Sequence, residues 1–420
     1  MTDLTNLEKR HLWHPFTPMA EWCAEDHEPL RMVDGCGCVL RDQHGNEYLD
    51  GNSSIWTNIH GHRHPTMDAA IREQLDRVAH TSFLGLSHEP AIRLAKGLVD
   101  LFPGEKLTRV FFSDDGSTAI ECAVRMALQF WKQSGKPERD TLLTFDRAYH
   151  GDTLGAASLG GLPVFKGSGN DFGYRVLNLS SMAEVEALPA SEKRRLAGAV
   201  VEPLIQGAAG MRIWPKGMLK QLSQWCGLND VLLILDEVMT GFGRTGTMFA
   251  CEQESVVPDL IALAKGLTGG YMPLAATITT ERVFEAFLGD GQTFFYGHSY
   301  TANPLGCAAA LASLRVFEEA QVLDKVASKI TTFAELLAPL KVHPSVIDVR
   351  QCGLIAGIEV GPFDPALRIG HQICLAARKH GLLTRPVVDT LVLMPPLCAS
   401  GEELARMVAA LTAAMNDVLG

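Results

Sequence analysis

One apolar stretch followed by a lysine constrains the fold of this chain more than any other feature. Residues 231–235 are five consecutive aliphatic side chains, and Asp236 and Glu237 follow them directly. Such a run predicts a strand that is buried on both faces, as in a parallel sheet. An aspartate at the end of such a strand is costly unless it has a cationic partner. Lys265 lies in a second apolar run that ends in glycines, where a lysine is equally unusual.

An acid and a lysine in these surroundings are the two groups that pyridoxal phosphate (PLP) requires of a protein. The acid keeps the pyridine nitrogen protonated, so that the ring can accept electrons. The lysine binds the aldehyde as a Schiff base and later moves a proton. The spacing of Asp236 and Lys265 fits a buried ion pair equally well, or a lysine that extends its ammonium group to solvent. The spacing alone leaves these interpretations open.

The composition excludes several other classes of protein. The chain has 420 residues, of which 47% are hydrophobic and 20% charged, as in soluble proteins with more than one domain. Its net charge of −11, without a Lys/Arg-rich segment, argues against nucleic-acid binding. No apolar run reaches the roughly 18 residues of a membrane span, and the N-terminus lacks a signal-peptide core. We expect the ten scattered cysteines to be reduced thiols in a cytoplasmic protein.

Helical and strand patterns alternate over most of the chain and predict an α/β fold. From about residue 325 the pattern changes to a separate set of helices and short strands. We therefore expect a large domain over residues 59–324, and a smaller α+β domain that combines 1–58 with 325–420. Strands are predicted at 109–113, 141–145, 199–203 and 231–238, and helices at 66–79, 89–102, 304–320, 321–340, 366–381 and 401–418.

Two strand ends in the large domain carry residues suited to a flat, phosphorylated ligand. The strand at 109–113 runs into a helix that opens with small and hydroxyl residues around Gly116 and Ser117. The free amides of such a turn can hold a phosphate, although an ordinary helix cap explains the same residues. Tyr149 follows the strand at 141–145, where an aromatic ring can stack on a cofactor or simply fill the edge of the core.

Three further patterns have less specific interpretations. His60, His62 and His64 alternate, but Gly61 and Pro65 favour a turn and no further ligand completes a metal site, so we expect no metal. The glycines of 241–246 match the dinucleotide fingerprint G-x-G-x-x-G, but they do not follow a strand end directly and no long helix follows them. We therefore reject a nicotinamide site.

Arg385 stands among apolar residues and is followed by Pro386. A guanidinium in such a place usually pairs with an anion. The partner is either an internal carboxylate or the carboxylate of a substrate.

Taken together, these motifs resemble those of the class III (ω-type) PLP-dependent aminotransferases, and within them the branch that acts in biotin biosynthesis. The resemblance runs nearly end to end. It is carried by His11–Thr17, Phe112–Ser117, Tyr149–Thr153, Asp236–Gly246, Lys265–Gly270, Gly297–Thr301, Arg385–Pro386 and Leu393–Pro396.

The resemblance implies PLP transferase fold type I, with a mostly parallel sheet flanked by helices in the large domain. It implies that Lys265 binds the PLP aldehyde and shuttles the proton, and that Asp236 pairs with the pyridinium nitrogen. Val238, two residues further along the strand, would pack on one face of the ring, and Tyr149 would cover the other. Residues of the helix start, Gly116 and Ser117, would hold the phosphate. Ser299 would reach the phosphate from a second subunit of a homodimer with shared active sites.

The resemblance also implies a reaction: 8-amino-7-oxononanoate receives an amino group by ping-pong transfer through PLP and becomes 7,8-diaminononanoate. Arg385 would bind the substrate carboxylate. Arg244 would serve the structure or bind the donor. The remaining substrate contacts would come from Phe16, Ile55, Trp56, Tyr149 and Gly297.

The chain departs from the common pattern of that branch at Phe16, where many members have tyrosine, and at Ile55, where they often have tryptophan. Both departures leave the amino donor open between S-adenosylmethionine and lysine. The alternatives are another ω-aminotransferase that acts on a diamine or β-amino acid with pyruvate, a nicotinamide oxidoreductase, and a catalytically silent binding protein.

Overall fold

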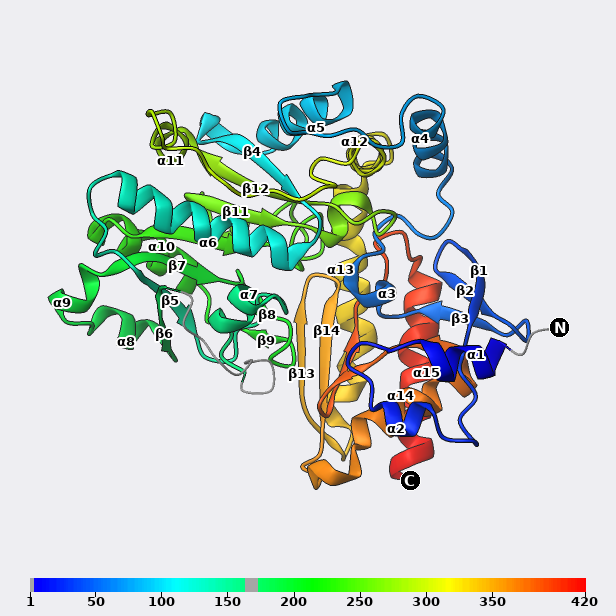
Figure 1. Cartoon of the computed structure of the whole chain (residues 1–420). Helices are drawn as coiled ribbons and strands as arrows, with labels where there is room; N and C mark the ends of the chain where they lie inside the picture. The colour runs from blue at the N-terminus through cyan, green and yellow to red at the C-terminus, as the bar shows by residue number, and fades with distance from the viewer. Residues whose placement is uncertain (1–3, 163–172) are drawn as a thin grey trace.

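A seven-stranded sheet occupies the left-hand part of the molecule in Figure 1, and the C-terminal part lies to its right. The computed structural model describes residues 4–162 and 173–420. Within the sheet β12 runs antiparallel to both of its neighbours, whereas β11, β10, β7, β5 and β6 run parallel, so the predicted α/β fold with a mostly parallel sheet is confirmed. In spatial order the strands are β4 (Leu107–Ser113), β12 (Ala275–Thr280), β11 (Leu260–Leu263), β10 (Leu232–Asp236), β7 (Leu196–Val201), β5 (Thr141–Phe145) and β6 (Arg175–Leu179).

The central strand β10 is the one that the apolar stretch predicts, and every residue in it is buried. Its side chains alternate between two cores. Leu233 and Leu235 face the core that contains helix α10 (Met218–Asn229), whereas Leu232 and Ile234 face the core that contains α6 (Gly116–Gln133). Helices thus cover both faces of the sheet, as a parallel sheet requires.

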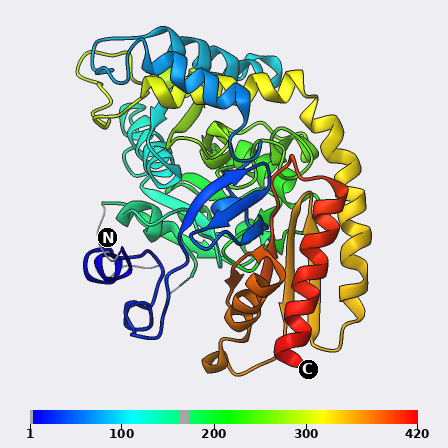
Figure 2. The same ribbon diagram turned by 90° about the vertical axis from the view of Figure 1, so that its right-hand side faces the viewer.

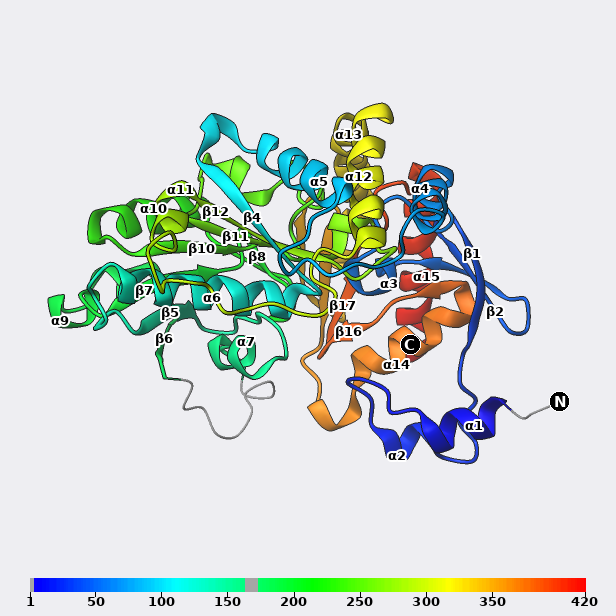
Figure 3. The same cartoon turned by 45° about the horizontal axis from the view of Figure 1, so that its top comes forward.

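Most of the remaining helices of this part of the chain lie around the sheet, whereas the helix Pro65–Leu75 packs against the helix Pro304–Glu319, away from the sheet (Figure 3). The predicted helices at 66–79 and 89–102 are present but end earlier, at Leu75 and Asp100. The helices are α4 (Pro65–Leu75), α5 (Glu89–Asp100), α7 (Leu154–Leu159), α8 (Met182–Glu186), α9 (Ala190–Lys193), α11 (Glu281–Glu285) and α12 (Pro304–Glu319). Two short strands, β8 (Ile205–Gln206) and β9 (Arg212–Ile213), form a separate ribbon.

The C-terminal part forms its own antiparallel sheet, in the order β13 (Val346–Cys352), β14 (Ile355–Val360), β17 (Thr390–Leu393) and β16 (Pro386–Val387). Helices α13 (Val322–Leu337), α14 (Ile369–Ala377) and α15 (Gly401–Leu419) pack together beside it, and Figure 2 shows α13 and α15 running alongside each other.

The N-terminal strands join this C-terminal part. Strands β1 (Met32–Cys36), β2 (Val39–Asp42) and β3 (Glu47–Asp50) form one sheet with β15 (Leu382–Leu383), which pairs with β3 in parallel. The N-terminal helices α1 (Leu4–His11) and α2 (Met19–Trp22) lie on the same side of the molecule (Figure 3). We therefore propose the division into a domain of residues 59–324 and a domain of 1–58 with 325–420. No helix in residues 4–162 and 173–420 combines the length and apolarity needed to cross a membrane.

Candidate active site

A cavity of about 380 Å³ collects most of the predicted site residues. It opens at the edge of the sheet where β7 and β10 end, because parallel strands present their carboxyl ends at the same edge. Its walls come from segments that are far apart in the sequence. The predicted residues that line it are Trp56, Gly116, Ser117, Tyr149, Asp236, Val238 and Lys265.

Lys265 opens a short 3₁₀ helix directly after β11, and its φ of 45° is unusual for a residue with a side chain. Its Nζ lies 4.7 Å from the centroid of the Trp56 ring. Burial lowers the pKa of Lys265 to about 8, although the carboxylates of Asp236 and Glu202 oppose this shift. With this pKa roughly one tenth of the amine is neutral at pH 7, far more than for an ordinary lysine, and this neutral fraction can act as a nucleophile and proton acceptor.

Asp236 forms a buried pair with a histidine. Its Oδ2 lies 2.7 Å from Nδ1 of His150, and its Oδ1 accepts a hydrogen bond of 3.1 Å from the backbone amide of Val238. Although burial lowers the pKa of His150, the hydrogen bond to Asp236 and the charges of Asp236 and Glu202 raise it overall. The carboxylate of Asp236 is thus held by His150 and by the Val238 amide at the wall of the cavity, where it can pair with a protonated nitrogen.

Val238 requires a correction. The strand prediction placed it within 231–238, pointing the same way as Asp236, but β10 ends at Asp236 and Val238 lies in the following turn. Its side chain still lines the cavity, because the turn folds back against the start of α6. A Cβ added to Gly116 would come within 2.6 Å of Cγ1 of Val238, so only glycine fits there.

The start of α6 presents unused donors to the cavity. Asp115 caps the helix by accepting a hydrogen bond of 2.9 Å from the amide of Thr118. In the described part of the chain no group accepts from the amides of Gly116 and Ser117. Two free amides at the N-terminus of a long helix are suited to a phosphate. The hydroxyl of Ser117 also accepts from the amide of Asp152 at 3.1 Å, which fixes the neighbouring loop.

Among the cavity residues that sequence reasoning missed are two buried ionisable side chains, His150 and Glu202. Glu202 accepts hydrogen bonds from the amides of Tyr149 (3.2 Å) and Gly207 (3.0 Å), and burial raises its pKa to about 7. A signal was present in the sequence, since Glu202 directly follows a buried strand, β7, whose neighbour β10 ends in Asp236. His150 had no comparable signal, because its role depends on a contact between two strand ends.

The cavity fits PLP. It combines a lysine amine, a carboxylate suited to a ring nitrogen, and free helix amides suited to a phosphate, and Nε2 of His150 is buried without a partner in the described structure. The histidines at 60, 62 and 64 do not converge on a metal. His60 contacts Ser313 and His62 contacts Asp50, and no group of three metal-binding side chains is found among the described residues.

The other predicted residues lie outside this cavity. Arg385 and Phe16 border a second cavity of about 770 Å³ between the N-terminal arm and the C-terminal part, with Cζ of Arg385 5.9 Å from the centroid of the Phe16 ring. Arg385 is exposed, and no carboxylate among the described residues pairs with it, so the described part of the chain supplies no internal partner. Ile55, Gly297 and Ser299 are exposed and do not line the first cavity.

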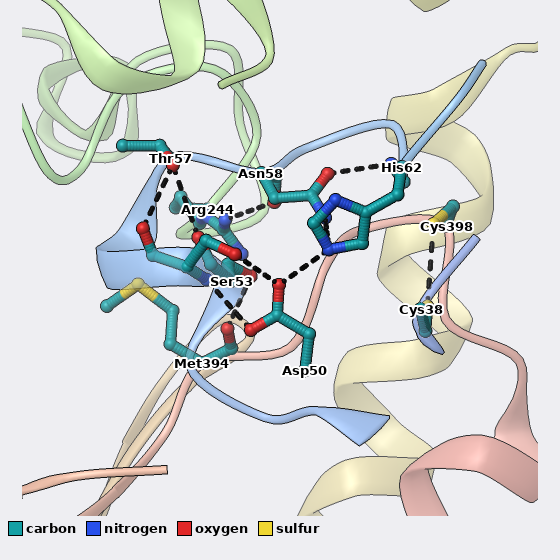
Figure 4. A network of polar contacts seen from close by, with 11 residues as sticks. Cys38, Asp50, Ser53, Thr57, Asn58, His62, Arg244, Met394 and Cys398 are labelled. Atoms are coloured by element: carbon teal, nitrogen blue, oxygen red, sulfur yellow. Dashed lines mark hydrogen bonds and ion pairs between the residues drawn. The ribbon is translucent and has the colours of Figure 1, made fainter. Parts of the chain in front are cut away.

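Arg244 is completely buried, and its hydrogen bonds link two segments of the fold. Its guanidinium donates hydrogen bonds to the carbonyls of Asn58 (2.7 Å) and Pro395 (2.5 Å), which joins the turn before the first cavity to the C-terminal part (Figure 4). The glycines around it are followed by a short 3₁₀ helix, Ala250–Glu254, and not by the long helix of a dinucleotide site.

Comparisons with known proteins agree with this geometry. The sequence profile described as Aminotransferase class-III matches residues 23–415. The adenosylmethionine-8-amino-7-oxononanoate aminotransferase of Geobacter sulfurreducens is 44% identical, over 99% of this chain and 98% of that protein. The crystal structure of the enzyme of that name from Methanocaldococcus jannaschii superposes with a TM-score of 0.95 at 37% identity, covering 99% of both chains.

A third relative is known with its cofactor. The amine transaminase from an uncultivated Pseudomonas species, solved in a PLP-bound form, superposes with a TM-score of 0.91 at 32% identity, over 97% of this chain and 99% of that one. Because the family profile covers nearly the whole chain and the cavity fits its cofactor, this chain is a member of the class III, PLP-dependent aminotransferase family.

Proposed function

We propose that this aminotransferase transfers an amino group to 8-amino-7-oxononanoate and forms 7,8-diaminononanoate in biotin biosynthesis. The names of the Geobacter and Methanocaldococcus relatives support this substrate and support S-adenosylmethionine as the donor. Lysine remains the alternative donor because of Phe16 and Ile55. The observation that carries the proposal is the convergence of Lys265 and Asp236 on one cavity in a chain of this family.

Lys265 is the proposed catalytic base. When bound, PLP supplies an electron sink that stabilises negative charge on the substrate carbon next to the amine. Nζ of Lys265 would hold the cofactor, and as a free amine it would take up the proton from that carbon and later release it. A pKa of about 8 lets the same amine accept and donate this proton near neutral pH.

The remaining cavity residues are proposed to orient the cofactor. Asp236, held by His150, pairs with the ring nitrogen and keeps it protonated. Val238 and Tyr149, which both line the cavity, would cover the ring and exclude water. The amides of Gly116 and Ser117 bind the phosphate.

We propose that the substrates enter between the two cavities. Arg385 has no carboxylate partner of its own among the described residues, which leaves its charge available for the carboxylate of the keto substrate. Phe16, Ile55 and Trp56 supply apolar contacts for the carbon chain. Of these, Trp56 lies next to Lys265, so it is the residue closest to the reacting end.

We propose a homodimer with shared active sites. Two neighbouring loops carry strongly exposed apolar side chains, Leu84 (91%) on one and Phe295 (84%) and Tyr300 (62%) on the other. The loops are joined by a hydrogen bond of 2.7 Å between His88 and the carbonyl of Ala302. An exposed apolar surface of this kind is typical of a subunit interface. Ser299 and Gly297, which lie outside their own cavity, are then placed to complete the cavity of the second subunit. We expect this dimer in the cytoplasm.

The visible spectrum of the purified protein tests the proposal. We expect a yellow protein whose colour is bleached by S-adenosylmethionine or by lysine without acceptor, and restored by 8-amino-7-oxononanoate. Whichever donor bleaches it is the amino donor. Bleaching by a diamine with recovery on pyruvate, and no response to 8-amino-7-oxononanoate, would favour a general ω-aminotransferase. A protein that stays colourless after incubation with PLP would contradict the proposal.

A further inference from the structure

Two cysteines that are far apart in the sequence meet beside the turn that carries Trp56. Cys38 is buried directly before β2, whereas Cys398 is exposed in the loop before α15. Their sulfur atoms lie 3.5 Å apart (Figure 4). The proposed amino transfer uses neither thiol.

The surroundings of Cys398 lower the pKa of its thiol, although burial opposes this shift, and the residue is exposed. It lines a small cavity of about 210 Å³ together with Lys325, Lys329 and His64. Nζ of Lys329 donates a hydrogen bond of 2.6 Å to the carbonyl of Leu397, which holds the ammonium group at the neighbouring residue. The contact with Cys38 and the charge of Lys329 lower the pKa of Cys398, whereas the contact with Cys398 and burial raise that of Cys38. Cys398 is therefore the more nucleophilic of the two thiols.

We propose that Cys398 is a peroxide-sensitive site and that it forms a reversible disulfide with Cys38. The sulfur of Cys398 attacks one oxygen of hydrogen peroxide, so that an S–O bond forms, the O–O bond breaks, and the other oxygen leaves as water. Cys38 then attacks the oxidised sulfur. An S–S bond forms, the S–O bond breaks, and the hydroxide leaves as a second water with the proton of Cys38. Two thiols are oxidised and one peroxide is reduced to two waters.

Formation of this bond requires a shift of the backbone or side chains. The sulfur atoms must approach from 3.5 Å to the bond length of about 2 Å. The room on one side is small, because a Cβ on Gly61 would lie 2.9 Å from Sγ of Cys398. The segment around Gly61 is also hydrogen-bonded to the segment that precedes Cys38, since the backbones of Gly37 and His62 exchange hydrogen bonds of 3.0 and 2.8 Å.

This shift acts on the turn that positions Trp56. From Cys38, hydrogen bonds lead to this turn in two steps. The carbonyl of Cys38 accepts from the amide of Asp50 at 2.8 Å. The carboxylate of Asp50 in turn accepts from the amide and the hydroxyl of Ser54, each at 2.8 Å (Figure 4). From the segment that leads to Cys398, the carbonyl of Met394 accepts a hydrogen bond of 2.6 Å from the hydroxyl of Ser53 in the same turn.

The turn itself is strained. Residues 53–56 all have positive φ, including 68° at the β-branched Ile55, which is an unfavourable conformation that its hydrogen bonds must hold. We infer that the disulfide changes substrate binding through this turn. This second step depends on the proposed function, whereas the disulfide itself does not.

The test uses the reduced holoenzyme, treated with hydrogen peroxide and then alkylated. Of the ten thiols, we expect two to be lost and to return with dithiothreitol, and peptide mapping to find residues 38 and 398 joined. In Cys38→Ser, Cys398 is expected to gain oxygen without a disulfide, and in Cys398→Ser both thiol losses should disappear. Cys36→Ser is the matched control, because Cys36 is exposed and lies close to Cys38 in the sequence, and it should behave as the wild type.

The proposal is overturned if no 38–398 link forms, if a different pair is joined, or if Cys398→Ser loses the same thiols. For the coupling, we expect the KM for the amino acceptor to change by roughly two- to thirtyfold on oxidation of the wild type and of Cys36→Ser, the range of coupling through packed networks. Unchanged kinetics in a fully linked protein would overturn the coupling and leave the disulfide standing.

Discussion

Nδ1 of His150 lies 2.7 Å from Oδ2 of Asp236, and both side chains are buried beneath the active-site cavity. The two residues come from the ends of different segments, one after β5 and one at the end of β10. Because the contact with His150 fixes the carboxylate of Asp236 at the cavity wall, this part of the cavity is suited to a group with a positive charge or a protonated nitrogen.

Replacement of Asp236 by asparagine removes this negative charge with little change in shape. We expect PLP still to bind, while turnover falls by roughly a hundred- to a thousandfold, as for the loss of other groups that stabilise charge in a transition state. The absorbance spectrum measures the first effect and a single-turnover assay the second. Asp140→Asn is the control, since Asp140 pairs with Arg195 at 2.5 Å and does not line the cavity. Near-normal turnover in Asp236→Asn would exclude the proposed role.

Replacement of Lys265 by alanine removes both the covalent attachment and the base. We expect loss of the yellow colour and a fall in turnover of at least about a thousandfold, within the range for loss of a general base. Lys220→Ala, at an exposed lysine on α10, should leave both properties unchanged. If Lys265→Ala keeps its colour and activity, the chain is not an aminotransferase of the proposed mechanism.

The pH dependence of PLP uptake tests the environment of Lys265. Only the neutral amine adds to an aldehyde, so the rate follows the deprotonated fraction and rises with pH. With a pKa of about 8, that fraction increases about tenfold from pH 7 to pH 9 and then levels off, because each pH unit below the pKa costs a factor of ten. Stopped-flow absorbance of the apoprotein with PLP measures the rate.

Glu202→Gln provides the comparison for this pH profile. Since the charge of Glu202 raises the pKa of Lys265, its removal should move the midpoint to lower pH. A rate that continues to rise beyond pH 9, as for an ordinary lysine, would show that burial does not shift this amine.

The sequence predicted the parts of the site that leave a local pattern, and it did not predict contacts between segments that are distant in the sequence. The buried strand and Lys265 were predicted because strand burial and the required cofactor groups leave a local pattern in the sequence. The pairing of His150 with Asp236, and of β15 with β3, joins segments that are distant in the sequence. No local pattern encodes such contacts.

Val238 lines the cavity, but strand geometry was the wrong reason to expect it there. Strand alternation was continued past Asp236, but the chain turns there, since Asp236 Oδ1 accepts the amide of Val238 in place of a sheet partner. The side chain reaches the cavity through that turn and not through strand geometry.

The proposed dimer is tested by placing a charge on its apolar surface. Phe295 is 84% exposed, and aspartate at this position would be buried without a partner if the surface is an interface. We expect Phe295→Asp to shift the protein from dimer to monomer in analytical ultracentrifugation and to weaken PLP retention. Leu228→Asp is the control, because Leu228 is 87% exposed on a different part of the molecule. A Phe295→Asp protein that remains dimeric would place the interface elsewhere.

Arg385 tests the position of the substrate carboxylate. Replacement by methionine keeps much of the side-chain length and removes the charge, so it should raise the KM for 8-amino-7-oxononanoate by roughly ten- to a hundredfold, the usual loss of a hydrogen bond to a charged group. The yellow colour should remain, because Arg385 does not line the cofactor cavity. Arg368→Met is the matched control, since Arg368 borders the same second cavity but is already paired with Glu21 at 2.6 Å. Equal KM values in Arg385→Met and the wild type would mean that another cation binds the carboxylate, whereas an equal rise in both variants would point to the general charge of the cavity.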